Sequence, residues 1–494
     1  MSKFFQIVER CKGFPLAITV VGRSLRAQPL EMWQNRLSQW AKGSSLFDSE
    51  TDLLLSLQSS LDALDKERAI IRECFLDLGS FPEDREIPVD ALIDIWSELY
   101  DIDEDTSCIA NLYELNNRSL ANLIDRRASS LDGEGYYGYH YVTQHDVLRE
   151  LAIYHSKLDP VEHRERLIID TCGSNLPKWW REQKYQVMKA RLLSLSAVLP
   201  TLASYSILYV ESSTLKCLNM HLPETEVLIL NMRYLNVRDM LYIPEFVEKM
   251  DKLKVLVITG EEARVPVVLH NFQVLSRLSN LKRIRLRGIS ISSIVKNSIQ
   301  VKSLRKLSLI RCSTGIGSAK LAHAFPNLEE IHIKHGSLLF HLPSDTRTVL
   351  RGLCDLISLK KVTLTEVRVF QVWALPDEIG NLVNLQVLRL RSCPDLSELP
   401  NSIKNLKKLN FLGIFNCEEF RELPECIGQM RSLRKIDTRG CRRLTTLPRS
   451  VLDLKQLEEV TCDEDTESLW KSLLPSFRDR NQDIRIVIGP PPLR

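Results

Sequence analysis

Gln144, His145 and Asp146 have the clearest potential for chemistry, because they stand just before residues 147–152, whose apolar side chains have helical spacing. Backbone N–H groups and a partial positive charge at the start of a helix suit a phosphate group. An imidazole there can donate a further hydrogen bond to a diphosphate. The same residues also fit a surface helix with a capped first turn. The pattern alone leaves both interpretations open.

The acidic run at residues 83–105 holds ten carboxylates and one basic residue. Asp101, Asp103 and Asp105 are spaced like the opening of a calcium loop. Thr106 replaces the turn glycine, however, and Leu112 occupies the twelfth position, so we expect no metal site. Such a run is usually a solvated helix face. A sharper hypothesis is that it docks, in cis or in trans, onto a basic surface as a latch.

Leucine accounts for about one residue in six of the 494, and its spacing indicates repeats. Leu-Pro recurs every 24 residues at Leu375, Leu399, Leu423 and Leu447. Between these positions the pattern L-x-x-L-x-L-x-x-C-x-x-L is typical of a leucine-rich repeat, with a strand at x-L-x-L and a return segment from Leu-Pro. Looser copies extend the solenoid to about 190–480, some ten or eleven rungs that bury their leucines only by stacking.

Cys393, Cys417 and Cys441 occupy one slot in three successive repeats. Stacked rungs lie about 4.8 Å apart, a spacing that would permit a disulfide. The slot points inward, however, where a small polar group satisfies backbone groups of the adjoining turn. We therefore predict a structural role for these cysteines and no metal binding.

The strand residues between the leucines face the concave surface and are mostly basic. Such a face should attract an acidic partner or an acidic surface of the same chain, although a merely solvated face fits equally well. If the acidic run docks there, charge reversal of Arg389, Arg391 and Arg439 is expected to loosen the contact. The candidate partner-binding residues are Arg283, Arg285, Arg287, Lys306, Arg389, Arg391, Lys435 and Arg439.

The first third of the chain has a different pattern. Residues 1–50 have helical spacing, and Leu54, Leu57, Leu61 and Leu64 form the stripe of an amphipathic helix. Another helix is predicted over 89–100, and residues 137–143 alternate like a strand before the helix that follows His145. Several helices and one late hairpin favour a winged-helix module at about 53–157.

Three segments together resemble plant nucleotide-binding leucine-rich-repeat immune receptors. GFPLA at 13–17 is similar to their GLPLA motif, CFLDLGSFPED at 74–84 to their CFL…FPED segment, and Gln-His-Asp at 144–146 to their Met-His-Asp. The glutamine, with Asp-Leu-Gly at 77–79, resembles the helper class. The order and spacing of these motifs, followed by repeats, cover nearly the whole chain.

The resemblance implies an α+β multidomain chain with a leucine-rich-repeat α/β solenoid. We expect the end of the NB-ARC helical subdomain at 1–52, the winged helix at 53–157, a linker or repeat cap at 158–189, repeats at 190–480 and a tail at 481–494. No G-x-x-x-x-G-K-[ST] phosphate loop occurs in the sequence. We therefore expect a chain without the nucleotide-binding lobe and the N-terminal signalling domain, either a truncated paralogue or an incomplete gene model.

For intact relatives the resemblance implies exchange of ADP for ATP, oligomerisation, defence and cell death. It also implies that His145 contacts the β-phosphate of ADP and that Pro15 lies by the adenine. Two such contacts without a phosphate loop supply little affinity, so we expect no bound ADP or ATP here. Candidate protein partners of the repeats are lipase-like signalling heterodimers and other receptors of the family.

Composition sets the remaining expectations. A pI of 8.2 is too mild to favour nucleic acid. No signal peptide or membrane span is evident, and the cysteines are dispersed, so we expect a cytoplasmic or nuclear protein. The sequence contains no GxSxG or HExxH motif, and we predict no enzyme activity. The alternative function is a repeat scaffold, a decoy or a regulator of full-length receptors.

Overall fold

The computed structural model describes most of the chain from residue 15 onward. The segments predicted to be helical at residues 1–14 and between 35 and 56 lie outside the described residues, as does Leu54. The described residues are 15–26, 69–102, 105–126, 137–171, 187–198, 220–233, 241–260, 266–291, 299–312, 321–334, 350–367, 374–480 and 482–489, with single positions at 29, 31, 33, 34, 57, 61 and 64.

The first part of the chain forms a helical unit with a small sheet, here named the N-terminal module. Its strands form an antiparallel sheet in the order β1-β3-β2, and its helices bury their apolar stripes in one core. Leu57, Leu61 and Leu64 are helical and buried, as their spacing predicts. The elements are α2 (Pro15–Ser24), α5 (Ala69–Leu78), β1 (Ile87–Pro88), α6 (Val89–Leu99), α7 (Asp105–Asn117), β2 (Asn122–Asp125), β3 (His140–Thr143) and α8 (Asp146–Ser156).

The rest of the chain winds into a solenoid with a sheet of 13 strands in the described residues. All the strand pairs of this sheet are parallel and in register, so that Leu388 lies beside Leu412 and Leu412 beside Ile436. The strands are β4 (Arg166–Thr171), β5 (Leu192–Val198), β6 (Val227–Arg233), β8 (Val255–Gly260), β10 (Arg283–Arg287), β12 (Lys306–Ile310), β13 (Glu330–Lys334), β14 (Lys361–Thr365), β15 (Val387–Arg391), β16 (Phe411–Phe415), β17 (Lys435–Asp437), β18 (Glu459–Cys462) and β19 (Arg485–Ile488).

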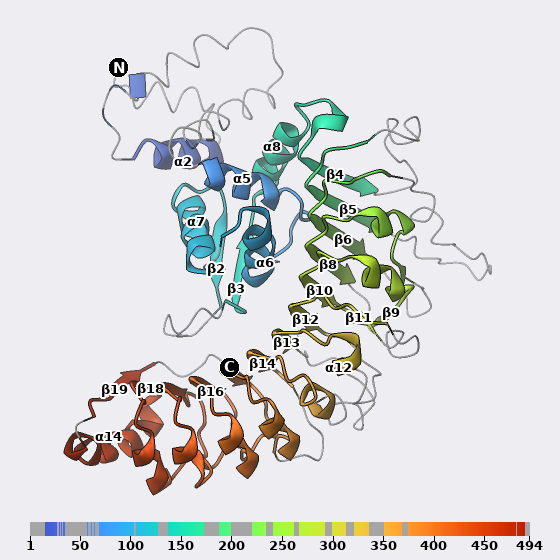
Figure 1. Ribbon diagram of the computed structural model, residues 1–494. Helices are drawn as coiled ribbons and strands as arrows, with labels where there is room; N and C mark the ends of the chain where they lie inside the picture. The colour runs from blue at the N-terminus through green and yellow to red at the C-terminus, as the bar shows by residue number, and fades with distance from the viewer. Residues whose placement is uncertain are drawn as a thin grey trace, which may run out of the picture.

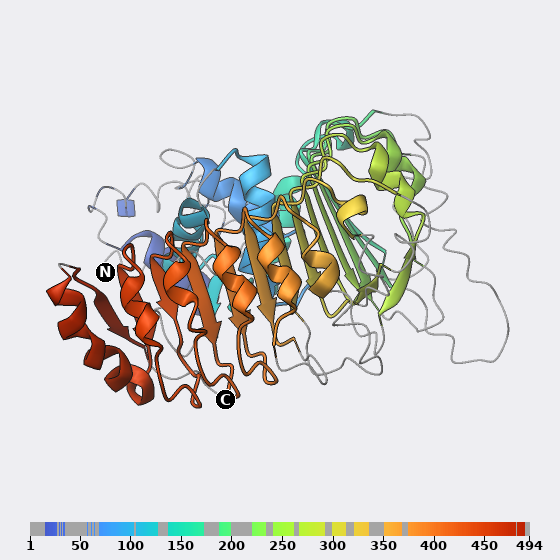
Figure 2. The same cartoon turned by 60° about the horizontal axis from the view of Figure 1, so that its bottom comes forward.

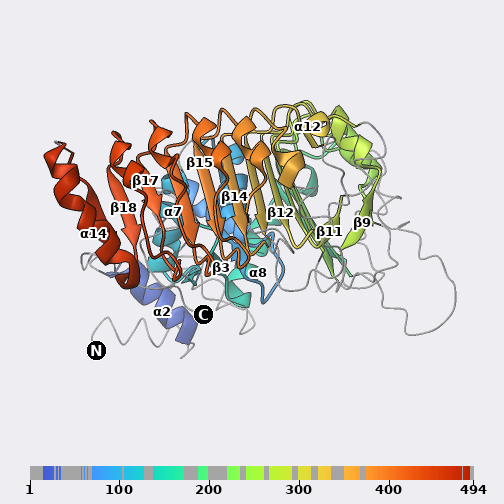
Figure 3. The same cartoon turned by 90° about the horizontal axis from the view of Figure 1, so that it is seen from below.

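Short helices and a second small sheet form the other side of the solenoid (Figure 2). The prolines of the Leu-Pro dipeptides cap three of the return helices, at Pro376, Pro400 and Pro448. Figure 3 shows α14 at the far end of the arc. These elements are η1 (Val161–His163), β7 (Leu241–Tyr242), η2 (Glu245–Lys249), β9 (Val267–His270), η3 (Phe272–Arg277), β11 (Ile289–Ser290), α12 (Leu321–Ala324), η5 (Asp377–Asn381), η6 (Asn401–Asn405), η7 (Ile427–Gln429), η8 (Arg449–Asp453) and α14 (Glu464–Asp479).

The repeats confirm the predicted leucine-rich-repeat solenoid but exceed its predicted limits. β4 lies in the segment expected to be a linker or cap, and β19 lies in the segment expected to be a tail. The cysteine slot has the predicted structural role, since the Cys441 thiol donates to the backbone oxygen of Ile414 at 3.0 Å. Cys417 makes the equivalent, longer contact with Leu390. The thiols thus satisfy carbonyl groups of the adjoining rung.

The N-terminal module lies within the arc of the solenoid, against the strands from β4 to β13 (Figure 1). On β6 and β8 the residues alternate between two cores: Leu228 and Leu256 face the solenoid core, whereas Val227 and Val255 join the core of the module. Apolar residues therefore occupy both faces of these strands, as expected for a sheet covered on both sides. Within the described part of the chain, no helix is long and apolar enough to cross a membrane.

Candidate functional site: the contact between the N-terminal module and the concave face

The acidic run predicted from sequence supplies one face of α6. Asp90, Asp94 and Glu98 are spaced four residues apart, which places them on the same side of the helix. The opposite side of α6 carries Trp96 and other apolar residues into the module core. The three carboxylates, which we name the acidic face, point toward β10, β12 and β13 of the solenoid.

Asp94 is the central contact of the acidic face. Its Oδ1 lies 3.0 Å from Nη1 of Arg283 and 2.7 Å from Nζ of Lys306. The Asp94 side chain is only 3% exposed. One carboxylate therefore bridges two adjacent rungs from a position that water barely reaches.

Glu98 lies one helical turn further along and extends the contact toward the start of the sheet. Its carboxylate accepts from Nζ of Lys282 at 2.8 Å and from Nε of Arg283 at 3.0 Å. Lys254 on the preceding rung donates to the backbone oxygen of Glu98 at 3.0 Å. The end of α6 is thus fixed by cations from two consecutive rungs.

Asp90 occupies the other end of the acidic face. Its Oδ2 lies 2.8 Å from Nη1 of Arg285 and 3.7 Å from Nδ1 of His332. Burial alone would raise the pKa of Asp90, but Arg285 and His332 outweigh it and hold that pKa well below its ordinary value. Burial lowers the pKa of His332 against the attraction of Asp90, so the imidazole is neutral at pH 7.

The cations opposite the acidic face stay charged in spite of burial. Burial opposes their ionisation, but Asp94 and Glu98 outweigh it and raise the pKa of Arg283. Asp94 and Glu330 do the same for Lys306. Partly buried ion pairs of this kind form a network, which contributes more than isolated exposed pairs.

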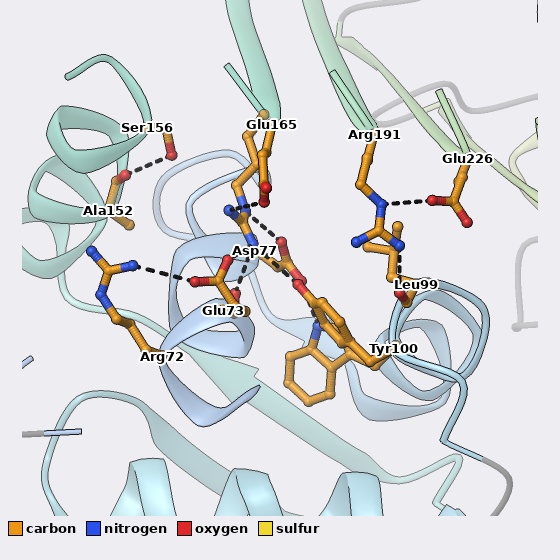
Figure 4. Close-up of polar contacts among 12 residues, drawn as sticks. Arg72, Glu73, Asp77, Leu99, Tyr100, Ala152, Ser156, Glu165, Arg191 and Glu226 are labelled. Atoms are coloured by element: carbon orange, nitrogen blue, oxygen red, sulfur yellow. Dashed lines mark hydrogen bonds and ion pairs between the residues drawn. The ribbon is translucent and has the colours of Figure 1, made fainter. Parts of the chain in front are cut away.

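A second polar cluster joins the first rung to the module core (Figure 4). Arg166 of β4 donates to Oδ1 of Asp77 at 2.7 Å and to Oε2 of Glu73 at 2.6 Å. Tyr100 and Trp96 donate to the other oxygen of Asp77, at 2.6 and 3.0 Å. Burial and the charge of Asp77 raise the pKa of Tyr100, which therefore keeps its proton as a donor. Asp77 is fully occupied by these contacts.

Arg191 provides a third link between the two parts (Figure 4). Its Nε donates to Glu226 of the neighbouring rung and its Nη2 donates to the backbone oxygen of Leu99, both at 2.6 Å. Arg191 therefore binds the C-terminal end of α6 to the start of β5. Together with the acidic face, these contacts hold α6 at both ends.

The predicted basic residues of the concave face fall into two groups. Arg283, Arg285 and Lys306 contact the acidic face, whereas Arg389 stacks on Phe411 at 4.9 Å and lies on a later rung. Arg391 stacks on Phe415 and on Tyr139 of the module, at 4.1 and 5.0 Å. Arg439 pairs with Asp437 at 2.6 Å, and Lys435 lies 4.0 Å from Glu459. Arg287 lines a cavity beside Asp90.

In the structure the acidic run lies against the basic concave face, as the latch hypothesis proposes, and its contacts there include the candidate residues Arg283, Arg285 and Lys306. The ion pairs of α6 in the described residues go to the region of β8–β13, and not to Arg389, Arg391 or Arg439. The charge pattern alone does not rank the rungs, because basic residues recur along the whole concave face. Val227 and Ile229, which occupy concave positions on β6, could have indicated which rungs are covered.

His145 stands directly before α8, as predicted. It is the N-cap residue, and the backbone N–H of Val147 donates to its Nδ1 at 3.2 Å. His145 and Asp146 are exposed, and Gln144 is half-buried. Pro15 is the first residue of α2. Whether Pro15 and His145 contact a nucleotide stays a prediction.

Comparisons with known proteins agree with the repeat architecture. The family described as "Leucine-rich repeat region" matches residues 341–485. The Arabidopsis thaliana "Probable disease resistance protein At4g33300" is 36% identical, covering 72% of this chain and 40% of the relative. "Disease resistance protein ADR1" of the same plant is 33% identical, covering 76% and 44%. The chain therefore spans less than half the length of these two relatives.

A third relative is covered over most of its own length. The "Probable disease resistance protein At5g66890" of Arabidopsis thaliana is 34% identical over 313 residues, which are 62% of this chain and 68% of the relative. The match therefore covers more than half of this chain and of the relative.

Removal of the Asp94 charge should weaken the contact between module and solenoid. Asp94→Asn leaves Arg283 and Lys306 partly buried without their shared carboxylate, and we expect a loss of about 2 kcal/mol in the free energy of unfolding. Urea denaturation followed by circular dichroism measures it. Glu419→Gln, which breaks only an exposed pair with Arg443, should cost under about 0.5 kcal/mol. Equal losses for both variants would contradict the assignment.

Acid should destabilise the folded chain in two steps. In the folded chain the pKa of His332 is lowered from 6.5 and that of Asp90 from 3.8. Burial would raise the pKa of Glu330, but Lys306 and Lys361 outweigh it and lower that pKa from 4.5 to about 2. Each group binds fewer protons in the folded chain than in the unfolded chain, so the stabilisation that these groups contribute is fully present above pH 6.5. The free energy of unfolding should decline slightly below pH 6.5, where His332 titrates in the unfolded chain, and steeply below pH 4.5, where the carboxylates do. Urea denaturation at a series of pH values tests this expectation, which a stability independent of pH between 7 and 4 would refute.

Proposed function

The chain belongs to the family of plant disease resistance proteins, and we propose that it is part of an immune receptor. In this proposal the N-terminal module is a winged-helix switch element that rests on its own repeats. The repeats have two tasks: β4–β13 hold the switch element, and the later rungs bind a protein partner. We place this function in the cytoplasm or the nucleus.

The observation that carries the proposal is the bridge from Asp94 to Arg283 and Lys306. A contact based on ion pairs across a seam is reversible, because each partner can be hydrated once the surfaces separate. Apolar contacts through Val227 and Ile229 give the closed arrangement its stability. The combination suits an element that is held at rest and is released by a competing interaction.

The later rungs carry a surface that the closed module helps to cover, since Arg389 and Arg391 are buried and Arg391 lies against Tyr139. Arg389 and Arg391 lie over Phe411 and Phe415, so their guanidinium planes are held by aromatic rings. Arginine and aromatic residues are enriched at the energetic centres of protein interfaces. A protein with an acidic patch fits this surface, and candidates are a lipase-like signalling heterodimer and another receptor of the family.

The proposal predicts that opening the contact changes partner binding. Asp94→Arg places a third cation against Arg283 and Lys306 and should release the module, which limited proteolysis will detect as faster cleavage. Capture of a co-expressed lipase-like heterodimer or of full-length ADR1 from leaf tissue should then increase several-fold. The increase should disappear in the triple variant that also carries Arg389→Glu and Arg391→Glu.

The matched control is Glu419→Arg, which reverses an exposed carboxylate on a rung remote from α6. This variant should behave as the unaltered chain in proteolysis and should not gain capture. The proposal is wrong if Asp94→Arg opens the module without any gain in partner capture. It is also wrong if the gain in capture persists in the triple variant with Arg389→Glu and Arg391→Glu.

Nucleotide binding by this chain is proposed to be too weak to measure. His145 already uses its Nδ1 as a helix cap and is exposed, and the sequence contains no phosphate loop. Titration calorimetry with ADP and with ATP should therefore give no saturable heat. Micromolar binding that His145→Ala abolishes would contradict this expectation and would assign a nucleotide site to the motif.

A further inference from the structure

A cavity of about 280 Å³ lies at the seam between the two parts of the chain. The module contributes Pro88, Asp90, Gly138 and Tyr141 to its wall. The solenoid contributes residues of β10, β13 and the turns that follow β12 and β14. The cavity is therefore lined by segments that are far apart in the sequence.

The wall of this cavity carries more positive than negative charge. The cationic side chains are Arg285, Arg287, Arg311 and Lys334, and the carboxylates are Asp90 and Glu366. The His332 imidazole on the same wall is neutral because burial lowers its pKa. Among the described residues of the wall, four cations thus stand beside two carboxylates.

Among the described residues, the two carboxylates of the wall are already engaged with Arg285 and Lys334. The Arg285 side chain is 7% exposed, and its Nη1 lies 2.8 Å from Asp90 without making a directed hydrogen bond. Oδ1 of Asp90 is buried and accepts no hydrogen bond from the described residues. Glu366 lies 3.4 Å from Lys334. Both carboxylates are therefore assigned to one cation each.

Arg311 is the cation whose charge is least compensated. It follows β12 in a left-handed conformation with φ 52°, and its backbone N–H donates to Lys334 at 2.7 Å. Its half-buried side chain makes no hydrogen bond or ion pair within the described part of the chain. The turn thus holds at the cavity wall a guanidinium that pairs with no carboxylate of the described residues.

We propose that this cavity binds a compact anion with several negative charges, of the phosphate or phosphate-ester class. Guanidinium groups bind phosphate through two parallel hydrogen bonds, and Arg285 and Arg311 offer such donors from two rungs. Lys334 supplies a point charge at the same wall. Because the wall is partly desolvated, these interactions are stronger than at an open surface.

The size and wall chemistry favour a small soluble anion over a macromolecule. A cavity of this volume is at the small end of ligand pockets, and both parts of the chain enclose it. The site adjoins the acidic face, because Asp90 and Arg285 belong to both, but all its cations belong to the solenoid. It is separate from the predicted nucleotide contacts at Pro15 and His145.

Calorimetric titration of the full chain with tripolyphosphate, at constant ionic strength, tests the proposal. We expect saturable binding with one ion per chain. Arg311→Gln should weaken this binding about tenfold, the cost of losing one charged pair of hydrogen bonds. Because Arg311 has no partner in the described residues, this variant should keep the melting temperature of the unaltered chain without ligand.

Two matched variants decide whether the cavity is the site. Glu366→Gln removes a carboxylate from its wall and should strengthen binding several-fold. Arg305→Gln changes an exposed arginine of the neighbouring segment, which faces Glu329 outside the cavity, and should leave binding unchanged. No saturable heat, or equal affinity in the Arg311→Gln and Arg305→Gln variants, would overturn the proposal.

The source of the anion is distinguished by two further arms. Vesicles with phosphatidylinositol phosphates carry the same chemistry on a lipid headgroup, and we expect no co-sedimentation of the chain with them. If the chain co-sediments with these vesicles and tripolyphosphate prevents it, the ligand is a lipid headgroup and the proposal of a soluble ion is wrong. If an acidic peptide displaces tripolyphosphate one for one, the ligand is a protein segment and the proposal of a small anion is wrong.

Discussion

The arrangement of this protein depends on three carboxylates of one helix meeting cations from consecutive rungs of a solenoid. A repeat sheet places equivalent positions of successive strands side by side, so Arg283 and Lys306 become neighbours although they lie in different repeats. Asp94 meets both of them at once. The periodicity of the helix matches the contact, because Asp90, Asp94 and Glu98 are each one turn apart. The charge balance of the whole chain therefore conceals two strongly charged surfaces that neutralise each other.

Charge alone would not hold the module in place, because exposed ion pairs contribute little. The concave face is divided between two kinds of contact. Val227, Ile229 and Val255 on the early rungs supply apolar area, and the rungs from β10 onward supply the cations that pair with the carboxylates of the acidic face. Burial of the early positions gives stability, whereas the ion pairs fix the orientation of α6. Arg166, which reaches Asp77 from the first rung, fixes the module at its other end.

Much of the fold could be predicted from the sequence because periodicity is a local signal. The leucine ladder, α6, β3 and the helix after His145 depend on spacing within a few residues, and the structure has each of them. The limits of the solenoid were harder to predict, since the segments of β4 and β19 lack the full repeat pattern. These segments form strands through pairing with β5 and β18. The site was predicted only in part. Opposite charges indicated that two surfaces could meet, but only the three-dimensional register selects Arg283 over Arg389.

The most direct measurement of the central claim is zero-length carbodiimide cross-linking followed by peptide mass spectrometry. This reagent joins a carboxylate to an amine only where the two are in contact. The described geometry predicts an intramolecular link from Glu98 to the half-exposed Lys282, at 2.8 Å, in monomer isolated at low concentration, whereas Asp94 is too buried for the reagent to reach. Glu329 and Lys360, which are 2.7 Å apart within the solenoid, provide the internal control. A link between Glu329 and Lys360 without any link from α6 to the solenoid would contradict the account.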